Sequence, residues 1–131
     1  MRTAIVMMLL VVVSGNAMAE WIEVAQDETH TTTFYVDPTT IHRSGDAVEM
    51  SSMYDFKTAA ESDGMKYLST RGQREYDCKE GRVRLVSLSL HSGNMGAGAE
   101  IHYLSDPLSK WEPVTTMTVG EALWKIACGK L

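Results

Sequence analysis

The chain has 131 residues, of which 44% are hydrophobic and 22% are charged, and its formal net charge is −5 at neutral pH. This length and composition are typical of one globular domain and exclude a long disordered chain. A phosphate backbone is held by clustered lysines and arginines. The acidic balance, with no obvious run of basic residues, therefore argues against a nucleic-acid partner.

Residues 1–19 have the three-part pattern of a secretory signal peptide. A basic N-terminal end precedes an unbroken apolar run of ten residues, Ala4 to Val13, and Ala17-Met18-Ala19 is an A-x-A cleavage signal. The run is well short of the ~20 residues that span a bilayer. We therefore expect cleavage between Ala19 and Glu20, and a single exported domain over residues 20–131 without a transmembrane segment.

Removal of the leader leaves a chain of 112 residues with 11 basic and 17 acidic side chains. No cysteine follows the apolar run, so the sequence does not predict a lipid-modified N-terminus. The expected location is the periplasm, the cell surface or the medium. A domain of this size buries roughly two thirds of its unfolded surface, which suffices for one modest core.

The first part of the mature chain has the signals of short strands. Trp21, Ile22 and Val24 begin one candidate. Residues 31–36 are β-branched or aromatic throughout, and we expect Asp37-Pro38 to end that strand. Ser44-Gly45-Asp46 marks a reversal, after which apolar and polar residues alternate over 48–56, as in a half-buried strand.

The strand signals continue to about residue 105. Residues 57–64 are expected to form a polar loop, followed by a long strand over 66–78 that is interrupted near Gly72, and Glu80-Gly81 predicts a turn. The apolar residues of 83–90 change phase at 85–86, which predicts a β-bulge. Residues 92–98 (SGNMGAG) are expected to be a flexible hairpin connection to a short strand at 100–104.

The C-terminal segment has the pattern of a helix. Thr118 and Glu121 form a capping box, and Gly129 stands where a C-terminal cap is expected. Between them, apolar residues fall on one helical face. Such a short helix depends on packing for its stability.

Cys78 and Cys128 are the only cysteines of the chain. In an exported protein they have only each other to pair with, so we expect a disulfide that ties the helix to a strand end. A redox pair of the C-x-x-C type and a four-ligand zinc site are less consistent with this spacing. The fold class predicted is α+β: a small antiparallel β-sheet of about six strands with a C-terminal helix.

No motif for catalysis, cofactor binding or metal binding is complete. None of the four histidines forms an H-x-x-x-H pair, and His91 and His102, which flank the glycine loop, fall short of a zinc ligand set. Both are expected to be solvated strand residues. The loop at 93–98 lacks the order of a phosphate-binding motif, and no G-x-S-x-G element is present. Met50, Met53 and Met65 are expected in the core. We expect no cofactor, no metal and no enzymatic activity.

Several short segments carry a resemblance to a known family, and they span nearly the whole mature chain. They are FYVD at 34–37, YD at 54–55, YLS at 67–69, EYDC at 75–78, RVR at 82–84, MGAG at 95–98, Trp111 and GEALWKIACG at 120–129. In their order and content the chain resembles the surface-adhesin protein E-like domain of exported bacterial proteins. The resemblance implies a small antiparallel sheet tied to a C-terminal helix by the two cysteines, and attachment to host extracellular proteins. Two features differ from that pattern, namely the Thr116-Met117-Thr118 lead into the helix and the missing lipid-acceptor cysteine.

Two functions from different classes remain open at this stage. The first is a non-enzymatic protein-binding module whose partner is a host extracellular or envelope protein. The stretches 57–64 and 105–111 are its expected contact regions, because binding residues often lie on loops held by a rigid scaffold. The alternative is a periplasmic protein that handles a small ligand, or a small hydrolase with an unrecognised site in a sheet cleft.

Overall fold

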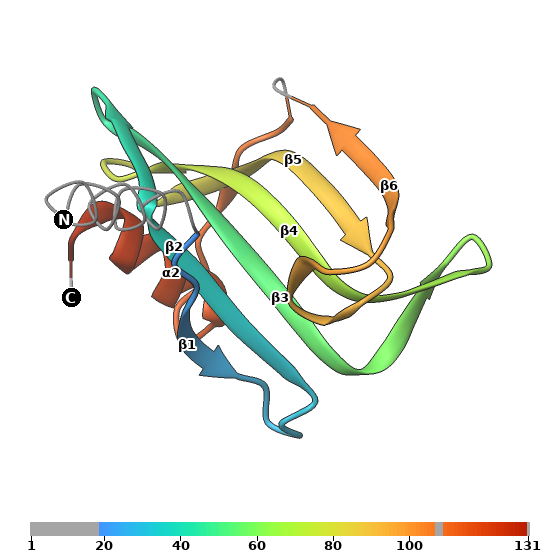
Figure 1. Ribbon diagram of the computed structural model, residues 1–131. Helices are drawn as coiled ribbons and strands as arrows, with labels where there is room; N and C mark the ends of the chain where they lie inside the picture. Colours follow the sequence, from blue (N-terminus) through green and yellow to red (C-terminus); the bar gives the residue numbers. More distant parts are fainter. Residues whose placement is uncertain (1–18, 107–108, 131) are drawn as a thin grey trace, which may run out of the picture.

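The computed structural model describes residues 19–106 and 109–130, so the expected signal peptide lies almost wholly outside the described residues. An antiparallel sheet and one C-terminal helix confirm the predicted α+β class (Figure 1). The elements, in chain order, are β1 (Ile22–Gln26), β2 (Thr32–Ser44), β3 (Ala47–Ser62), β4 (Met65–Asp77), β5 (Arg82–His91), the 3₁₀ turn η2 (Asn94–Gly96), β6 (Glu100–Ser105), β7 (Glu112–Pro113) and α2 (Val119–Cys128). Strands β1 to β6 follow one another across the sheet, and the short β7 pairs with β5.

Strand β2 does not end at Asp37-Pro38, as the sequence had suggested. It continues to Ser44, and only its pairing with β3 is interrupted, between Asp37 and His42. The Asp37 carboxylate accepts hydrogen bonds from the amide and the hydroxyl of Thr39, which holds the irregular segment in place. Proline is compatible with such a position because no ladder hydrogen bond is required of it there.

The prediction of a polar loop over 57–64 is also wrong. Strand β3 continues to Ser62, Asp63 and Gly64 form a two-residue turn, and β4 begins at Met65. Both turn residues have positive φ, 51° for Asp63 and 78° for Gly64, as tight hairpin turns require. The alternation of apolar and polar residues is interrupted in this segment, where the pairing of β3 with β4 shifts register between Asp55 and Ala60.

The predicted bulge at 85–86 is confirmed. Gln73 pairs with Ser87 while Arg74 pairs with Leu85, so Val86 is the extra residue of β5. Gly72, in contrast, does not interrupt β4, which runs without a break to Asp77. A Cβ at Gly72 would lie 2.8 Å from Nη1 of Arg74, so the glycine makes room for the arginine side chain.

The predicted helix cap is confirmed with one difference. The Thr118 hydroxyl accepts a hydrogen bond from the amide of Glu121, and Gly129 adopts the left-handed conformation at the C-terminal cap. The Glu121 carboxylate reaches back to the amide of Met117, one residue earlier than in a standard capping box.

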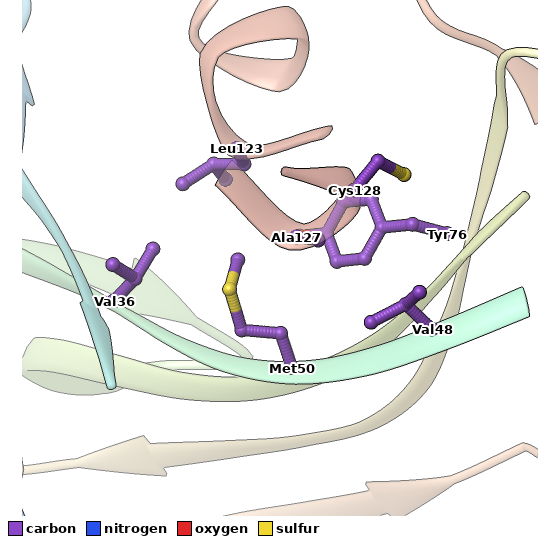
Figure 2. Packing of buried hydrophobic residues seen from close by; sticks show 7 residues of the cluster. All are labelled: Val36, Val48, Met50, Tyr76, Leu123, Ala127 and Cys128. Carbon is purple, nitrogen blue, oxygen red and sulfur yellow. The ribbon is translucent and has the colours of Figure 1, made fainter. Parts of the chain in front are cut away.

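The core lies between α2 and one face of the sheet, which we call the helix face. Its buried hydrophobic residues come from β2, β3, β4 and the helix (Figure 2); they are Val36, Val48, Met50, Tyr76, Leu123, Ala127 and Cys128. Met50 and Met53 are buried as expected, whereas Met65 is 44% exposed, which corrects its assignment to the core. Met65 is exposed because it is the first residue after the turn of the β3–β4 hairpin.

The predicted disulfide between Cys78 and Cys128 is confirmed, with the two Cα atoms 5.7 Å apart. It joins the residue after β4 to the last residue of α2. The indole Nε1 of Trp124 donates a hydrogen bond to the carbonyl of Asp77 at 2.9 Å, beside the disulfide. The C-terminal half of the helix is therefore fixed to the end of β4 by one covalent bond and one hydrogen bond.

Candidate binding surfaces

The two residues of the expected cleavage site lie at the beginning of the described chain. Ala19 and Glu20 are exposed. The backbone amide of Glu20 donates a hydrogen bond to Oδ2 of Asp37 at 3.3 Å. The bond between Ala19 and Glu20 thus lies at the surface, next to the hydrogen bond between Glu20 and Asp37, and cleavage there stays a prediction.

The first expected contact region, residues 57–64, is the distal part of the β3–β4 hairpin. Figure 1 shows this hairpin reaching out from the sheet at the end opposite the helix. Most of its side chains are exposed, and Met65 adds an exposed apolar side chain next to the turn. The hairpin therefore offers an accessible protruding surface built on two paired strands rather than on a loose loop.

The second expected contact region, residues 105–111, is described except at 107 and 108. It is fastened to β5: the amide of Asp106 donates to the carbonyl of Val86, and the hydroxyl of Ser109 donates to the carbonyl of Leu85. The guanidinium groups of Arg82 and Arg84 lie 5.0 and 4.3 Å from the ring centre of Trp111. Such cation–π contacts hold the tryptophan against the strand.

A pocket of about 320 Å³ lies between β4, β5 and this segment. Its basic side chains are Arg74, Arg84 and Lys110, and among the described residues Glu112 is the one carboxylate in its lining. Arg84 forms an ion pair with Glu75, at 2.7 Å. The positive character of the pocket therefore comes mainly from Arg74 and Lys110, which form no ion pair with another described residue.

Arg74 occupies an unusual place for a cation. It lies two residues before the buried Tyr76 on β4, so the two side chains point to the same face, the helix face of the sheet. Its Nη1 donates to the Ser52 hydroxyl at 2.9 Å, and its guanidinium lies 5.1 Å from the ring centre of Tyr54. Sequence reasoning missed this residue, although a signal was present: an arginine stands where the alternation of β4 calls for a core side chain.

A second, smaller depression of about 150 Å³ lies on the opposite face of the sheet, which we call the polar face. It is lined mainly by small hydroxyl and amide side chains, among them Ser87, Ser89 and Gln73, with Arg71 and Tyr103 at its border. No carboxylate lines it among the described residues. This surface is shallow and polar, and its side chains carry one positive charge.

The histidines that flank the glycine loop do not form a pair. His102 is exposed and pairs with Leu90, whereas His91 pairs with Glu100. His91 is only 6% exposed, which corrects the expectation that it is solvated, and its Nε2 lies 2.8 Å from the Ser89 hydroxyl. Burial, and next the nearby Arg71, lower the pKa of His91, while Glu100 acts in the opposite direction.

The pairing of Ser89 with His91 does not by itself make a hydrolase site. A serine nucleophile needs a histidine that is oriented by a third group, and both atoms must reach a substrate. Ser89 and His91 are both buried, and within residues 19–106 and 109–130 no carboxylate accepts a hydrogen bond from His91. We therefore interpret the pair as internal polar packing.

The glycine loop is folded onto the polar face instead of being free. The amide of Met95 and the side-chain amide of Asn94 both donate to Oδ1 of Asp55, at 2.8 and 3.0 Å. The amide of Gly96 donates to the Ser69 hydroxyl, which itself donates to the carbonyl of Gly93. The expected flexible connection is therefore a 3₁₀ turn held by hydrogen bonds to β3 and β4.

Two further properties concern the described part of the chain only. Across residues 19–106 and 109–130, no three His, Cys, Asp or Glu side chains are arranged so that they could hold a metal ion. None of the helices found there has the length and apolar character needed to cross a membrane.

Comparison with known proteins identifies one family and one fold. The family model for surface-adhesin protein E matches residues 21–129. Comparison with curated protein sequences gives no significant match. Crystal form II of Haemophilus influenzae protein E is similar in structure, with a TM-score of 0.61 at 13% identity, over 87% of this chain and 91% of that one.

Two further structures of the same relative agree. A second structure of Haemophilus influenzae protein E has a TM-score of 0.57 at 12% identity, over 83% of this chain and 93% of that one. Protein E from non-typeable Haemophilus influenzae has a TM-score of 0.54 at 12% identity, over 86% of each chain. At such low identities, the structural likeness establishes a common fold.

Proposed function

Since the chain belongs to the surface-adhesin protein E family, we propose that it is an exported, non-enzymatic module that attaches to another protein, either at the cell surface or in the bacterial envelope. The observation that carries the proposal is the family match over residues 21–129, nearly the whole of the expected mature domain. The partner in this proposal is a host extracellular protein or an envelope protein.

The protruding β3–β4 hairpin is the contact surface that best suits this role. A partner gains most from exposed apolar and aromatic side chains carried on a rigid support. The hairpin presents Met65 at its tip, and an edge-to-face contact between Phe56 and Tyr67, with ring centres 5.8 Å apart, packs its two strands against each other. In this proposal the hairpin contacts the surface of another folded protein.

Location is the property to measure first, by protease shaving of intact cells with fractionation and a periplasmic control protein. Degradation in intact cells would support surface attachment and justify a binding assay against immobilised extracellular matrix proteins. Protection in intact cells, together with release in the periplasmic fraction, would contradict attachment to host proteins. The partner would then have to be sought among envelope proteins.

A variant pair tests the hairpin in the same binding assay. Met65→Ser removes the exposed apolar side chain at the tip, and Met117→Ser is the matched control because Met117 is 96% exposed and lies before α2. We expect M65S to weaken binding several-fold and M117S to leave it unchanged. Equal binding by both variants would exclude Met65 from the contact.

A further inference from the structure

Arg74 is a cation with too few partners for its position. It is half-buried on the helix face of the sheet, where the neighbouring side chains are mostly apolar. Among the described residues only one of its five N–H donors has an acceptor, the Ser52 hydroxyl, and no carboxylate forms an ion pair with it. A guanidinium in such surroundings is usually paired, because leaving a charge without a partner there is costly.

The position of Arg74 is nevertheless fixed by the fold. Gly72 leaves space for its guanidinium, since any Cβ there would come within 2.8 Å of Nη1. The ring centre of Tyr54 lies 5.1 Å from the guanidinium carbon Cζ, and the Ser52 hydroxyl accepts a hydrogen bond from Nη1. Three neighbours therefore orient a planar fork of donors, and such a fork matches the two oxygens of a carboxylate.

The pocket beside Arg74 has the charge balance of a site for one negative charge. Arg74 and Lys110 contribute two cations that form no ion pair within residues 19–106 and 109–130, the ion pair with Glu75 largely neutralises Arg84, and Glu112 contributes one negative charge. One net positive charge remains. Because Glu112 and the acidic balance of the whole chain repel multiply charged ligands, a sulfated or phosphorylated polyanion fits this pocket poorly.

The remaining lining residues indicate which kind of ligand would carry the negative charge. Val83 and Leu85 give the pocket an apolar wall, and its volume of about 320 Å³ is at the small end for ligand sites. We propose that this pocket binds a single carboxylate on a short aliphatic stem, with Arg74 as the bidentate donor and Lys110 as a second cation. The carboxylate comes either from a free aliphatic acid or from an acidic side chain of a protein.

Hexanoate is a suitable probe, titrated into the purified protein and followed by ¹H–¹⁵N NMR, with hexanamide as the neutral counterpart. We expect saturable binding in the millimolar range, with shifts concentrated at Val83, Leu85 and Ser109. Hexanamide should bind at least tenfold more weakly because the charge-assisted hydrogen bonds are lost. Equal binding of acid and amide, or shifts outside the pocket, would overturn the proposal.

The variants Arg74→Gln and Lys110→Gln test the two cations, and Arg43→Gln, at an exposed position of β2, is the matched control. We expect R74Q to weaken hexanoate binding at least tenfold, K110Q to weaken it less, and R43Q to leave it unchanged. Far-UV circular dichroism and the melting temperature establish that each variant is folded. Arg74→Lys keeps the charge without the fork, so its affinity should lie between those of wild type and R74Q. Unchanged binding by folded R74Q would also overturn the proposal.

The source of the carboxylate is decided with the peptide Ac-Ala-Glu-Ala-NH₂ and its glutamine counterpart. Binding of the glutamate peptide at the same residues assigns the pocket to an acidic side chain of a protein, while binding of hexanoate alone assigns it to a free acid. This outcome is independent of the adhesin proposal. A protein that stays in the periplasm but binds hexanoate at Arg74 would overturn host attachment and leave the carboxylate site standing.

Discussion

The backbone amide of Glu20 donates a hydrogen bond to the buried carboxylate of Asp37, at 3.3 Å. Asp37 is 3% exposed, and its other oxygen accepts hydrogen bonds from Thr39. Within the described residues no lysine, arginine or histidine forms an ion pair with it. If the leader is cleaved after Ala19, the amide of Glu20 becomes an ammonium group. Processing would then place a positive charge beside the buried Asp37 carboxylate, which forms no ion pair with another described residue.

This relationship predicts that a chain starting at Glu20 is more stable than one that retains Met18-Ala19. A charge-assisted hydrogen bond contributes roughly 1.5–3 kcal/mol to the free energy of unfolding. Asp37→Asn should therefore destabilise the chain that starts at Glu20 more than the extended one. Urea unfolding of all four proteins gives the coupling free energy between the terminus and Asp37. A coupling close to zero would show that the new terminus does not pair with Asp37.

The disulfide predicts a large loss of stability in the double variant Cys78→Ala/Cys128→Ala. The two cysteines are 50 residues apart. In the chain-entropy model, closing a loop of that length stabilises by about 4 kcal/mol, a large part of the stability of a small domain. The reduced wild type should melt at nearly the same lowered temperature as the double variant. Oxidised and reduced wild-type protein that melted together would contradict a stabilising role for the bond.

Because the hydroxyl of Tyr76 is buried, we predict that its removal does not destabilise the protein. Tyr76 is 1% exposed in the core, and its hydroxyl has no hydrogen-bond partner among the described residues. Burial raises the pKa of this phenol well above its usual range. Because a buried polar group without a partner is costly, Tyr76→Phe should leave stability unchanged or raise it by about 1 kcal/mol. Tyr76→Ala should cost about 3–5 kcal/mol through loss of the ring. Marked destabilisation by Y76F would reveal a partner for the hydroxyl.

The sequence predicted those features that depend on local patterns. The turn at Gly45, the bulge at residues 85–86 and the cap at Thr118 each follow from the conformational or hydrogen-bonding properties of a few adjacent residues. The disulfide followed from the number of cysteines and the expected export. The antiparallel order of the strands is the simplest arrangement for short strands joined by tight turns.

The features that were missed depend on residues far apart in the chain. Asp55 and Ser69 fold the glycine loop onto the sheet, and neither is near that loop in sequence. Strand β3 extends to Ser62 because residues 60–62 pair with β4, despite weak strand signals of their own. The pocket around Arg74 requires β4, β5 and the segment before β7 to meet, which no local pattern indicates.

The lowered pKa of His91 predicts that the protein loses stability as the pH falls. Burial and Arg71 lower the pKa of His91 in the folded chain, against the opposing effect of Glu100, whereas in the unfolded chain the side chain titrates near its ordinary value of about 6.5. The unfolded chain therefore binds a proton more readily. The contribution of neutral His91 to stability is complete above pH ~6.5 and is lost as the pH falls below that value.

The free energy of unfolding should therefore decrease as the pH falls below about 6.5 in wild type, and it should decrease more gradually in His91→Asn. Asparagine is a suitable replacement because its side chain can still bond with the Ser89 hydroxyl without titrating in this range. The matched control is His42→Gln, since His42 is a histidine at an exposed position of β2. We expect H42Q to retain the wild-type slope. Parallel pH profiles for wild type and H91N would show that His91 is not the group responsible.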